Sequence, residues 1–437
     1  MRLHHSWCSW DTIQSPTIVA AQDEPSLSPR PRTLRHFAAV AVAGVLCLHI
    51  WFFATVWNDT KRGYPDFTVY YTAALMLRAG MGHHLYEERA QFAVNDRFEI
   101  EKHHPRARLP YIHPPFEALI FVPLTFLPYP AAFAIWDGLN VAALFGVFVV
   151  LRGSIIFLRS IPAWQLVAAS LAFYPVFGCL LQGQDSILLL LVSALGFCAA
   201  ARDADFLAGS WFGLGMFKPQ FILPMVIFLL IRKRKPMLAG FLSVCVVLLL
   251  LSAALVGWQQ ISHYPAFAVE IANSPFFGGT PAQFAPNIRG LITGWPYRSL
   301  TLPGFFAAAG SVFLFVLVFL VLWAARQRRE PNLSHSLMAI TAPLVAWQTN
   351  MHDLCLLVLP LIFVINYCLT LRAPLARRVA LLAPAVLLLV SPLWLLLWLV
   401  WGRSNLIAVV LLWWVCDLSR EILPHDRGSA ASVHSPV

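Results

Sequence analysis

The chain has 437 residues, of which 59% are hydrophobic and only 12% are charged, and its mean hydropathy is +0.69. A soluble domain carries about 25% charged residues, so this composition excludes an ordinary soluble protein and predicts an all-helical, polytopic membrane protein. The net charge of +10 does not indicate nucleic-acid binding. The basic residues form short clusters between apolar runs, which is the pattern of the positive-inside rule.

The two ends of the chain are predicted to be cytoplasmic tails. Residues 1–35 are polar, contain the stretch PSLSPRPRT and are expected to be disordered. The apolar run 37–57 follows, and no small-residue cleavage site comes after it, so it is expected to be an anchor and not a signal peptide. A membrane domain of residues 36–418 is predicted to end at a second tail, residues 419–437.

Basic clusters set the predicted topology of the membrane domain, because they mark cytoplasmic ends of spans. This gives about twelve spans, with two external loops at 58–130 and 258–302. The predicted spans are 37–57, 131–151, 163–181, 187–201, 206–217, 220–231, 236–257, 303–325, 335–350, 354–371, 379–400 and 405–416. Since a full crossing takes about 20 residues, the arms 206–217 and 220–231 fit only if their turn lies in a water-filled recess.

The segment 114–130, PPFEALIFVPLTFLPYP, is apolar but is not counted as a span. Two prolines open it, two more lie inside it, and Glu117 is charged. If it crossed the membrane, Arg152 and Arg159 would face the external side, against the positive-inside rule. It is therefore predicted to be a juxtamembrane or re-entrant helix, and both alternatives remain open.

The predicted topology gathers polar side chains at the external face, opposite the basic clusters. This convergence predicts an external cavity lined by hydrogen-bonding groups. The residues that it brings to that face are Asp66, His113, Gln182, Gln184, Asp185, Lys218, Asn287, Arg289, His352 and Asp353.

Asp66 begins the helix-like stretch DFTVYYTAALMLRAG. Its carboxylate can cap that helix, or it can act as a general base. Phe67, Tyr70 and Tyr71 offer aromatic surfaces for a sugar or an isoprenoid chain. Asp59, in the polar context NDTKRG, is expected to be solvated.

Lys218 is the other prominent charge, because it lies between two apolar arms, where a cation costs about 2.5–3.5 kcal/mol. Pro219 ends the helix at that point, which favours a phosphate ligand over a lysine that extends to the membrane surface.

Other polar residues have weaker signals. Gln182 and Gln184 can bind sugar hydroxyls or only satisfy the turn QGQDS, and Arg289 can bind phosphate bidentately or lie at the surface. His352 can orient an anionic group, whereas Asp185 and Asp353 are expected to cap helices.

Neither a metal nor a nucleotide cofactor is expected. The eight cysteines are scattered without a CxxC pair, and the histidine pairs at 83–84 and 103–104 lack acidic or cysteine partners at ligand spacing. No Walker loop and no GxGxxG segment precedes a helix.

Several segments together resemble glycosyltransferase family 87 of the GT-C superfamily, in order over about residues 60–370. They are DFTVYYTAALMLRAG, YIHPPFEALIFVPLTFLPYPAAFAIWDGLN, GQDSILLLLVSALGF, AGSWFGLGMFKPQFILPMVIFLLIRKRK, PNIRGL and HDLCLLVLPLIF. The family's acidic residue after the first span falls on Asp66, and its Lys-Pro turn falls on Lys218-Pro219. Glu87 departs from the family, in which Asp is more usual.

The resemblance implies a GT-C-like fold in the cell membrane and transfer of a mannose-like hexose from a polyprenyl-phosphate donor. The acceptor would be a hydroxyl of a glycolipid or glycan on the external side, and the reaction would invert the anomeric centre. Asp66 would be the general base, and Lys218, Arg289, His113 and His352 would stabilise the leaving phosphate.

A transporter or flippase of lipid-linked saccharide is the alternative, since broken helices and buried polar groups also mark transporters. Transporter sites, however, lie near the midplane between internal repeats, and here the polar groups gather at one face. A purely structural membrane protein is the third possibility, and the placement of Lys218 argues against it.

Overall fold

The computed structural model describes residues 32–63, 65–96, 109–231, 234–273, 281–295, 301–326, 331–370 and 374–423. These residues form helices and turns, with no strand among them, which confirms the predicted all-helical fold. Of the predicted tails, residues 1–31 and 424–437 lie outside the described residues. Helix α1 begins at Arg32, and α20 continues to Ile422, past the predicted end of the membrane domain at residue 418.

The helices coincide with the predicted apolar runs. In chain order they are α1 (Arg32–Lys61), α2 (Phe67–Arg78), α3 (Glu88–Asn95), α4 (Pro115–Phe121), α5 (Tyr129–Arg152), α6 (Ile156–Arg159), α7 (Ala163–Leu171), α8 (Tyr174–Gln182), α9 (Ser186–Ala201), α10 (Asp205–Leu214), α11 (Pro219–Leu230), α12 (Lys235–Val256), α13 (Trp258–Asn273), α14 (Ile288–Thr293), α15 (Thr301–Ala324), α16 (Pro331–Val345), α17 (Val358–Thr370), α18 (Leu375–Leu388), α19 (Ser391–Leu395) and α20 (Ile407–Ile422). Short 3-10 turns η1 (Gly82–His84), η2 (Val122–Phe126), η4 (Ala282–Phe284) and η5 (His352–Leu357) join some of them.

Five described helices are long and apolar enough to cross a membrane, and two bent helix pairs raise the number to seven. The five are His36–Lys61, Tyr129–Arg152, Lys235–Val256, Leu302–Ala324 and His352–Thr370. Helices occupy the other predicted spans, but none of them is longer than the 16 residues of α9 and α20, or about 24 Å. The chain is thus a multi-pass membrane protein, and twelve full crossings are not shown.

The predicted span 163–181 is not straight. It consists of α7 and α8, which meet at an angle of 78°. Pro175 is the second residue of α8, where its missing N–H leaves no helical hydrogen bond unmade, whereas inside a continuous helix it would break one. In the same way, Pro392 opens α19 after a bend of 53° from α18. The prolines therefore mark bends that the apolar pattern alone does not reveal.

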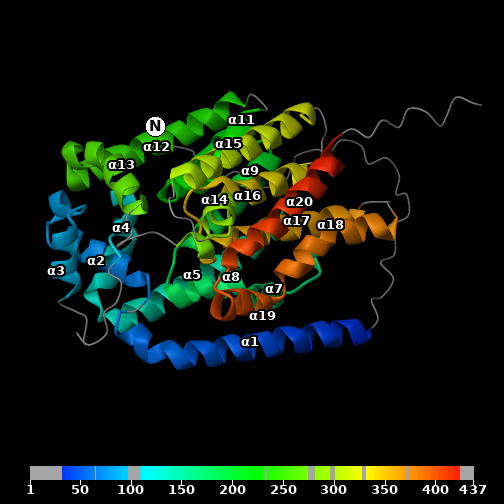
Figure 1. Ribbon diagram of the computed structural model, residues 1–437, viewed down its shortest axis with the longest axis horizontal. Coiled ribbons are helices and arrows are strands. Elements are labelled where there is room, and N and C mark those ends of the chain that lie inside the picture. The colour runs from blue at the N-terminus through cyan, green and yellow to red at the C-terminus, as the bar shows by residue number, and fades with distance from the viewer. Residues whose placement is uncertain are drawn as a thin grey trace, which may run out of the picture.

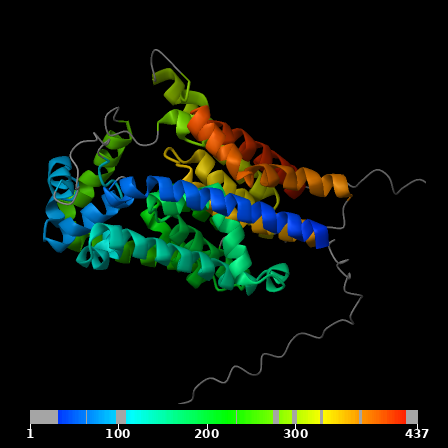
Figure 2. The same ribbon diagram turned by 90° about the horizontal axis from the view of Figure 1, so that it is seen from below.

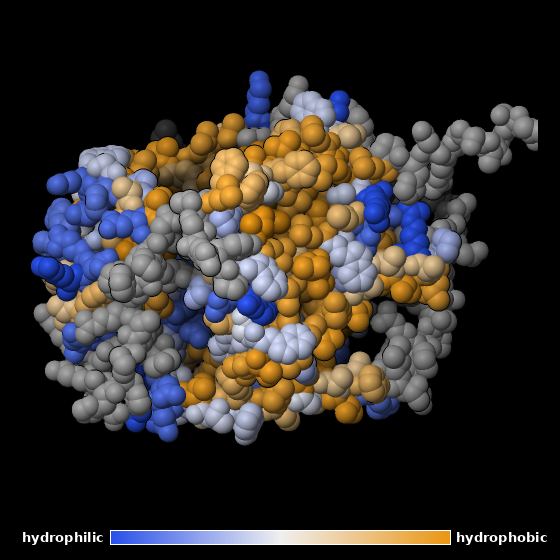
Figure 3. All heavy atoms as spheres, in the orientation of Figure 1, coloured by the Kyte–Doolittle hydropathy of each residue, from blue (hydrophilic) through white to orange (hydrophobic). Residues whose placement is uncertain are grey.

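The helices run largely side by side, with α1 along one edge of the molecule and α12 along the opposite edge (Figure 1). Seen from below, α1 lies across the bundle along much of its length (Figure 2). Hydrophobic side chains cover the middle of the face in Figure 3, and hydrophilic ones gather at the end formed by α2 and α3. This distribution is typical of a bundle that crosses a membrane and bears a polar region at one end. We call this region, which contains α2, α3, α4 and α13, the polar cap.

The polar cap contains more helix than the sequence predicts. Helix α13 occupies much of the predicted external loop 258–302, and α3 lies within the other external loop. Segment 114–130 folds into the short helix α4 and turn η2 before α5 begins. A hydrophobic core of its own, which includes Phe67, Tyr70 and Phe121, lies within the cap.

Candidate active site

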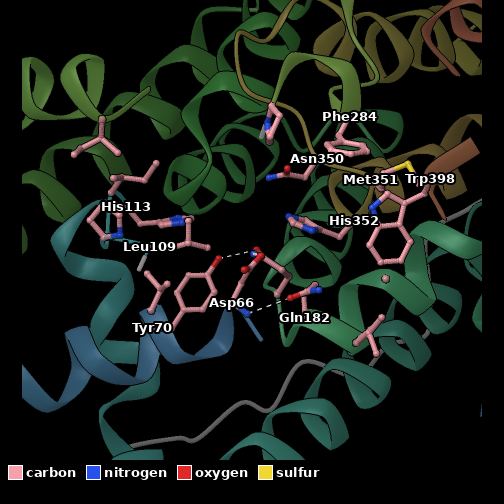
Figure 4. Close-up of a pocket in the computed structure, with 18 of the residues that line it drawn as sticks. Asp66, Tyr70, Leu109, His113, Gln182, Phe284, Asn350, Met351, His352 and Trp398 are labelled. Carbon is pink, nitrogen blue, oxygen red and sulfur yellow. Dashed lines mark hydrogen bonds between the residues drawn. The ribbon is translucent and has the colours of Figure 1, made fainter. Parts of the chain in front are cut away.

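A cavity of ≈380 Å³ lies between the polar cap and the helical bundle. Asp66, His113 and His352 come from separate elements and point toward the same space (Figure 4). The lining residues are Asp66, Val69, Tyr70, Leu109, Pro110, Ile112, His113, Tyr174, Gly178, Leu181, Gln182, Gln184, Ile271, Pro281, Phe284, Asn350, Met351, His352 and Trp398. The predicted convergence of Asp66, His113, Gln182, Gln184 and His352 is thus present in the structure.

Asp66 precedes α2, but its carboxylate makes no capping hydrogen bond to the helix. Of the two roles that the sequence left open for Asp66, the structure does not show the cap. Instead, Oδ2 of Asp66 accepts a hydrogen bond of 2.9 Å from Nε2 of Gln184. The backbone N–H of Asp66 donates to Oε1 of Gln182 at 3.2 Å. Both glutamines of the 182–186 turn consequently hold Asp66, one by its side chain and one by its backbone.

Two side chains of α5 donate hydrogen bonds to the turn that carries Gln184. Gly183 has φ of 60°, the left-handed conformation that favours glycine. A Cβ on Gly183 would lie 2.7 Å from the Cβ of Phe67, so a larger residue cannot be placed here. Nε1 of Trp136 donates to the Gly183 carbonyl at 2.9 Å, and Nδ2 of Asn140 donates to the Gln184 carbonyl at 3.0 Å. These contacts fix the position of Gln184 relative to Asp66.

Tyr70 sets the orientation of the Gln184 amide. Its hydroxyl donates to Oε1 of Gln184 at 2.7 Å, so the amide nitrogen is left to face Asp66. The Tyr70 ring stacks on Phe121, with centroids 4.7 Å apart and planes inclined by 11°. Because Tyr70 is almost fully buried, this contact takes up one of the aromatic faces that the sequence offered to a sugar.

Lys218 lies behind the cavity wall and does not line the cavity. Its side chain is only 3% exposed, and Nζ lies 2.7 Å from Asp353 Oδ1, 2.9 Å from Asp185 Oδ1 and 2.7 Å from Ser186 Oγ. These three acceptors match the three donors of an ammonium group, so no donor remains for a phosphate. A direct phosphate contact of Lys218 would therefore require its ammonium group to leave one of these protein partners.

The acids that bind Lys218 were expected to cap helices. Asp185 makes no capping hydrogen bond to α9, and it pairs with Lys218 instead. Asp353 pairs with Lys218 through Oδ1 and accepts a hydrogen bond from the Asn350 backbone N–H through Oδ2. Lys218 thereby ties the turn that carries Gln184 to the segment that carries His352.

His113 and His352 lie on opposite sides of the cavity (Figure 4), and His113 contacts a buried acid. Its Nδ1 lies 3.0 Å from Oε2 of Glu117, whose side chain is fully buried. Burial lowers the pKa of His113 to about 4, so its imidazole is neutral at physiological pH. Burial, followed by the charge of Asp185, raises the pKa of Glu117 well above its usual range.

Besides Lys218, two more predicted site residues lie outside the cavity. Tyr71 is buried in the cap, and its hydroxyl donates to the Leu127 carbonyl at 2.8 Å. Arg289, on α14, stacks over Trp347 with its guanidinium carbon 5.6 Å from the ring centroid. Nη2 of Arg289 approaches Oε1 of Gln348 at 3.5 Å. Neither Tyr71 nor Arg289 is part of the cavity lining.

The sequence did not reveal the apolar part of the lining. Tyr174, Phe284 and Trp398 belong to distant segments, and each lies in an apolar context without a local signal of function. Glu117 and Asp185, in contrast, had a usable signal, because ionisable residues within apolar segments of membrane proteins are rarely without a role.

The sequence model of glycosyltransferase family 87 matches residues 111–347. The chain belongs to this family. This membership identifies the protein as a glycosyltransferase. No curated protein matches the chain.

The matched region of this family 87 glycosyltransferase is narrower than the resemblance over residues 60–370. It contains His113, Gln182, Gln184, Lys218 and Arg289. Asp66 and His352 lie outside it, and their place in the site rests on the geometry of the cavity.

Proposed function

We propose that this family 87 glycosyltransferase moves a mannose-like hexose from a polyprenyl-phosphate donor to an acceptor hydroxyl, with inversion and with Asp66 as the general base. The observation that carries the proposal is a carboxylate at the cavity wall that makes no cap and is oriented by a side-chain amide. Membership in a glycosyltransferase family favours sugar transfer over transport, because the family is defined by a reaction, whereas broken helices occur in both classes of protein.

In this reaction the acceptor oxygen attacks the anomeric carbon while its proton passes to the Asp66 carboxylate. The new bond joins the acceptor oxygen to the anomeric carbon, and the bond from that carbon to the phosphate oxygen breaks. The electron pair leaves with the polyprenyl phosphate. A positioned base contributes about 10²–10⁴-fold to such a step, and a single displacement inverts the anomeric configuration.

The leaving phosphate lies, in this proposal, between the two histidines of the cavity wall. His113 and His352 both line the cavity, and a ring N–H of each is a donor for a developing phosphate charge. Arg289, which does not line the cavity, would add positive charge near the phosphate. Lys218 acts indirectly, because its ion pairs hold the segments that carry Gln184 and His352.

The apolar part of the cavity favours a lipid-linked donor over a soluble sugar nucleotide. Tyr174, Leu181, Phe284 and Trp398 line it, and an isoprenoid chain can bury its methylene groups there at about 0.8 kcal/mol each. The polar residues, Asp66 and the two histidines, then surround the sugar and the phosphate.

The topology of the proposal follows the basic clusters. Both tails lie in the cytoplasm, the segments are arranged as about twelve passes, and the cavity opens to the external or periplasmic side of the cell membrane. The partners are the lipid bilayer, the lipid-linked sugar and a glycolipid or glycan acceptor. No nucleic acid and no cofactor take part.

The test is the consumption of polyprenyl-phosphate hexoses by the purified protein in detergent, with a panel of acceptors and analysis of the product anomer. We expect release of polyprenyl phosphate and a product of inverted configuration. Accumulation of lipid-linked saccharide across sealed vesicles, without its cleavage, would contradict the proposal. Mass spectrometry of envelope lipids and glycans with and without the gene identifies the acceptor.

A further inference from the structure

Three potential metal ligands meet at the wall of the cavity. They are Nδ1 or Nε2 of His113, a carboxylate oxygen of Glu117 and one of Asp185, and all lie within 4.8 Å of one another. Metal–ligand bonds of about 2.0–2.2 Å place two ligand atoms at most about 4.4 Å apart, so only a small movement would close the group around an ion. The three residues come from the segment before α4, from α4 and from the turn before α9.

The carboxylates of this group lack the partners that buried acids need. Glu117 is fully buried, and among the described residues neither of its oxygens has a hydrogen-bond partner of good geometry, although Nδ1 of His113 lies 3.0 Å from Oε2. Oδ2 of Asp185, which is 1% exposed, also receives none, although Oδ1 of the same residue contacts Lys218. Unpaired buried carboxylate oxygens are strongly unfavourable unless a cation or a proton satisfies them.

The charges around these carboxylates also indicate that a further cation or a proton is required. When ionised, Glu117, Asp185 and Asp353 bring three negative charges to one buried cluster, and Lys218 supplies one positive charge to two of them. Glu117 has no basic partner within this cluster other than His113.

We propose that His113, Glu117 and Asp185 bind a divalent transition-metal cation, Mn²⁺ or Zn²⁺. One imidazole nitrogen with two carboxylate oxygens favours these ions over Mg²⁺ and Ca²⁺, which prefer oxygen ligands alone. Three protein ligands leave at least one coordination position for water or a substrate oxygen. The cation would join the cap helix α4 to the turn that carries Gln184. This site does not depend on the proposed transfer reaction.

The experiment uses untagged full-length protein in detergent, treated with EDTA and then titrated with Mn²⁺ or Zn²⁺. Calorimetry and elemental analysis measure the bound metal. We expect one equivalent in the wild type and a higher unfolding temperature when the metal is present. Glu117→Gln keeps the size of the side chain and should weaken binding at least about 10-fold, the loss that even an outer-shell change causes.

The exposed pair His84 and Glu87 offers a matched control. Nδ1 of His84 lies 2.9 Å from Oε1 of Glu87, and each side chain is 55% exposed. Glu87→Gln should bind metal as the wild type does. Should Glu117→Gln fail to fold, His113→Asn provides the same comparison.

Two outcomes overturn the proposal. One is a wild-type protein that retains no metal and unfolds at the same temperature with and without it, which would indicate a proton shared by Glu117 and Asp185. The other is a folded Glu117→Gln protein that binds the metal as tightly as the wild type.

Discussion

The side-chain amide of Gln184 donates a hydrogen bond of 2.9 Å to the carboxylate of Asp66, 118 positions earlier in the chain. This contact joins the first polar segment after α1 to the turn between α8 and α9. It places a hydrogen-bond donor on one oxygen of the proposed base and leaves the other oxygen to a substrate.

The first prediction concerns this contact. Gln184→Glu places a second carboxylate beside Asp66, and a neighbouring negative charge disfavours ionisation of a carboxyl group. Transfer should therefore fall at neutral pH, and the acidic limb of the rate–pH profile should move to higher pH. The measurement is kcat as a function of pH.

Gln182→Met is the matched control for that profile. Gln182 accepts a hydrogen bond from the backbone N–H of Asp66, and the donor to the Asp66 carboxylate is Gln184. The acidic limb should stay where it is in the wild type. A profile that moves equally in both variants would argue against orientation of the base by Gln184.

The second prediction compares two adjacent tyrosines. Tyr70→Phe removes the hydrogen bond that orients Gln184, and a net contribution of about 0.5–1.5 kcal/mol predicts a loss of transfer of up to about 10-fold. Tyr71→Phe removes a bond to the Leu127 carbonyl in the cap and none to Gln184 among the hydrogen bonds of the described residues. It should lower the unfolding temperature and leave kcat close to that of the wild type. Equal losses of kcat would show that the two hydroxyls do not differ in role.

The third prediction concerns Lys218. Lys218→Met leaves Asp185 and Asp353 buried without their cation, and breaking a buried pair in this way costs about 3–5 kcal/mol. Lower thermal stability should therefore accompany any loss of activity, and the donor KM of the folded fraction should change little. A stable variant with a greatly raised donor KM would instead indicate direct phosphate binding.

Arg234→Met is the control for Lys218→Met, because Arg234 also pairs with two acids, Asp203 and Asp205. Its side chain is 24% exposed, that of Asp203 is 87% exposed and that of Asp205 is 18% exposed, so both pairs are better solvated than those of Lys218. An exposed pair contributes about 0–1 kcal/mol, so the unfolding temperature should change much less.

The positions of the helices could be predicted from the sequence, because apolar runs and prolines are local signals. The convergence of Asp66, His113, Gln182, Gln184 and His352 followed from the order of the spans. The partners of each side chain could not be predicted in this way. Lys218 pairs with Asp353, which lies 135 positions later in the chain. No local sequence pattern predicts such a contact.

The different partners of the Tyr70 and Tyr71 hydroxyls could not be predicted from the sequence either. Consecutive helical residues point about 100° apart, so one hydroxyl reaches Gln184 and the other reaches Leu127. Deciding which tyrosine faces the cavity requires the rotation of α2 about its axis, and packing against α4 and α5 sets that rotation. The bend between α7 and α8 depends in the same way on what surrounds Pro175.

The fourth prediction concerns topology. Helix α1 has 30 residues and is about 45 Å long, so its two ends lie on opposite sides of a bilayer. In a variant without native cysteines, a cysteine at Glu88 should label from the external side and one at Arg326 from the cytoplasm. The measurement is labelling by a membrane-impermeant thiol reagent in oriented vesicles. Labelling of position 88 from the cytoplasmic side would place the cavity on the wrong side for the proposed reaction.

The most direct test of the proposed mechanism is the rate of sugar transfer by purified Asp66→Asn, with thermal stability recorded beside it and Asp59→Asn as the control. Asn keeps the shape of the side chain and an oxygen that accepts from Gln184, but it cannot take the acceptor proton. We expect a stable protein in which transfer falls by about 10² or more, while Asp59→Asn remains active. A stable Asp66→Asn protein with near-normal transfer would contradict the assignment of Asp66 as the general base.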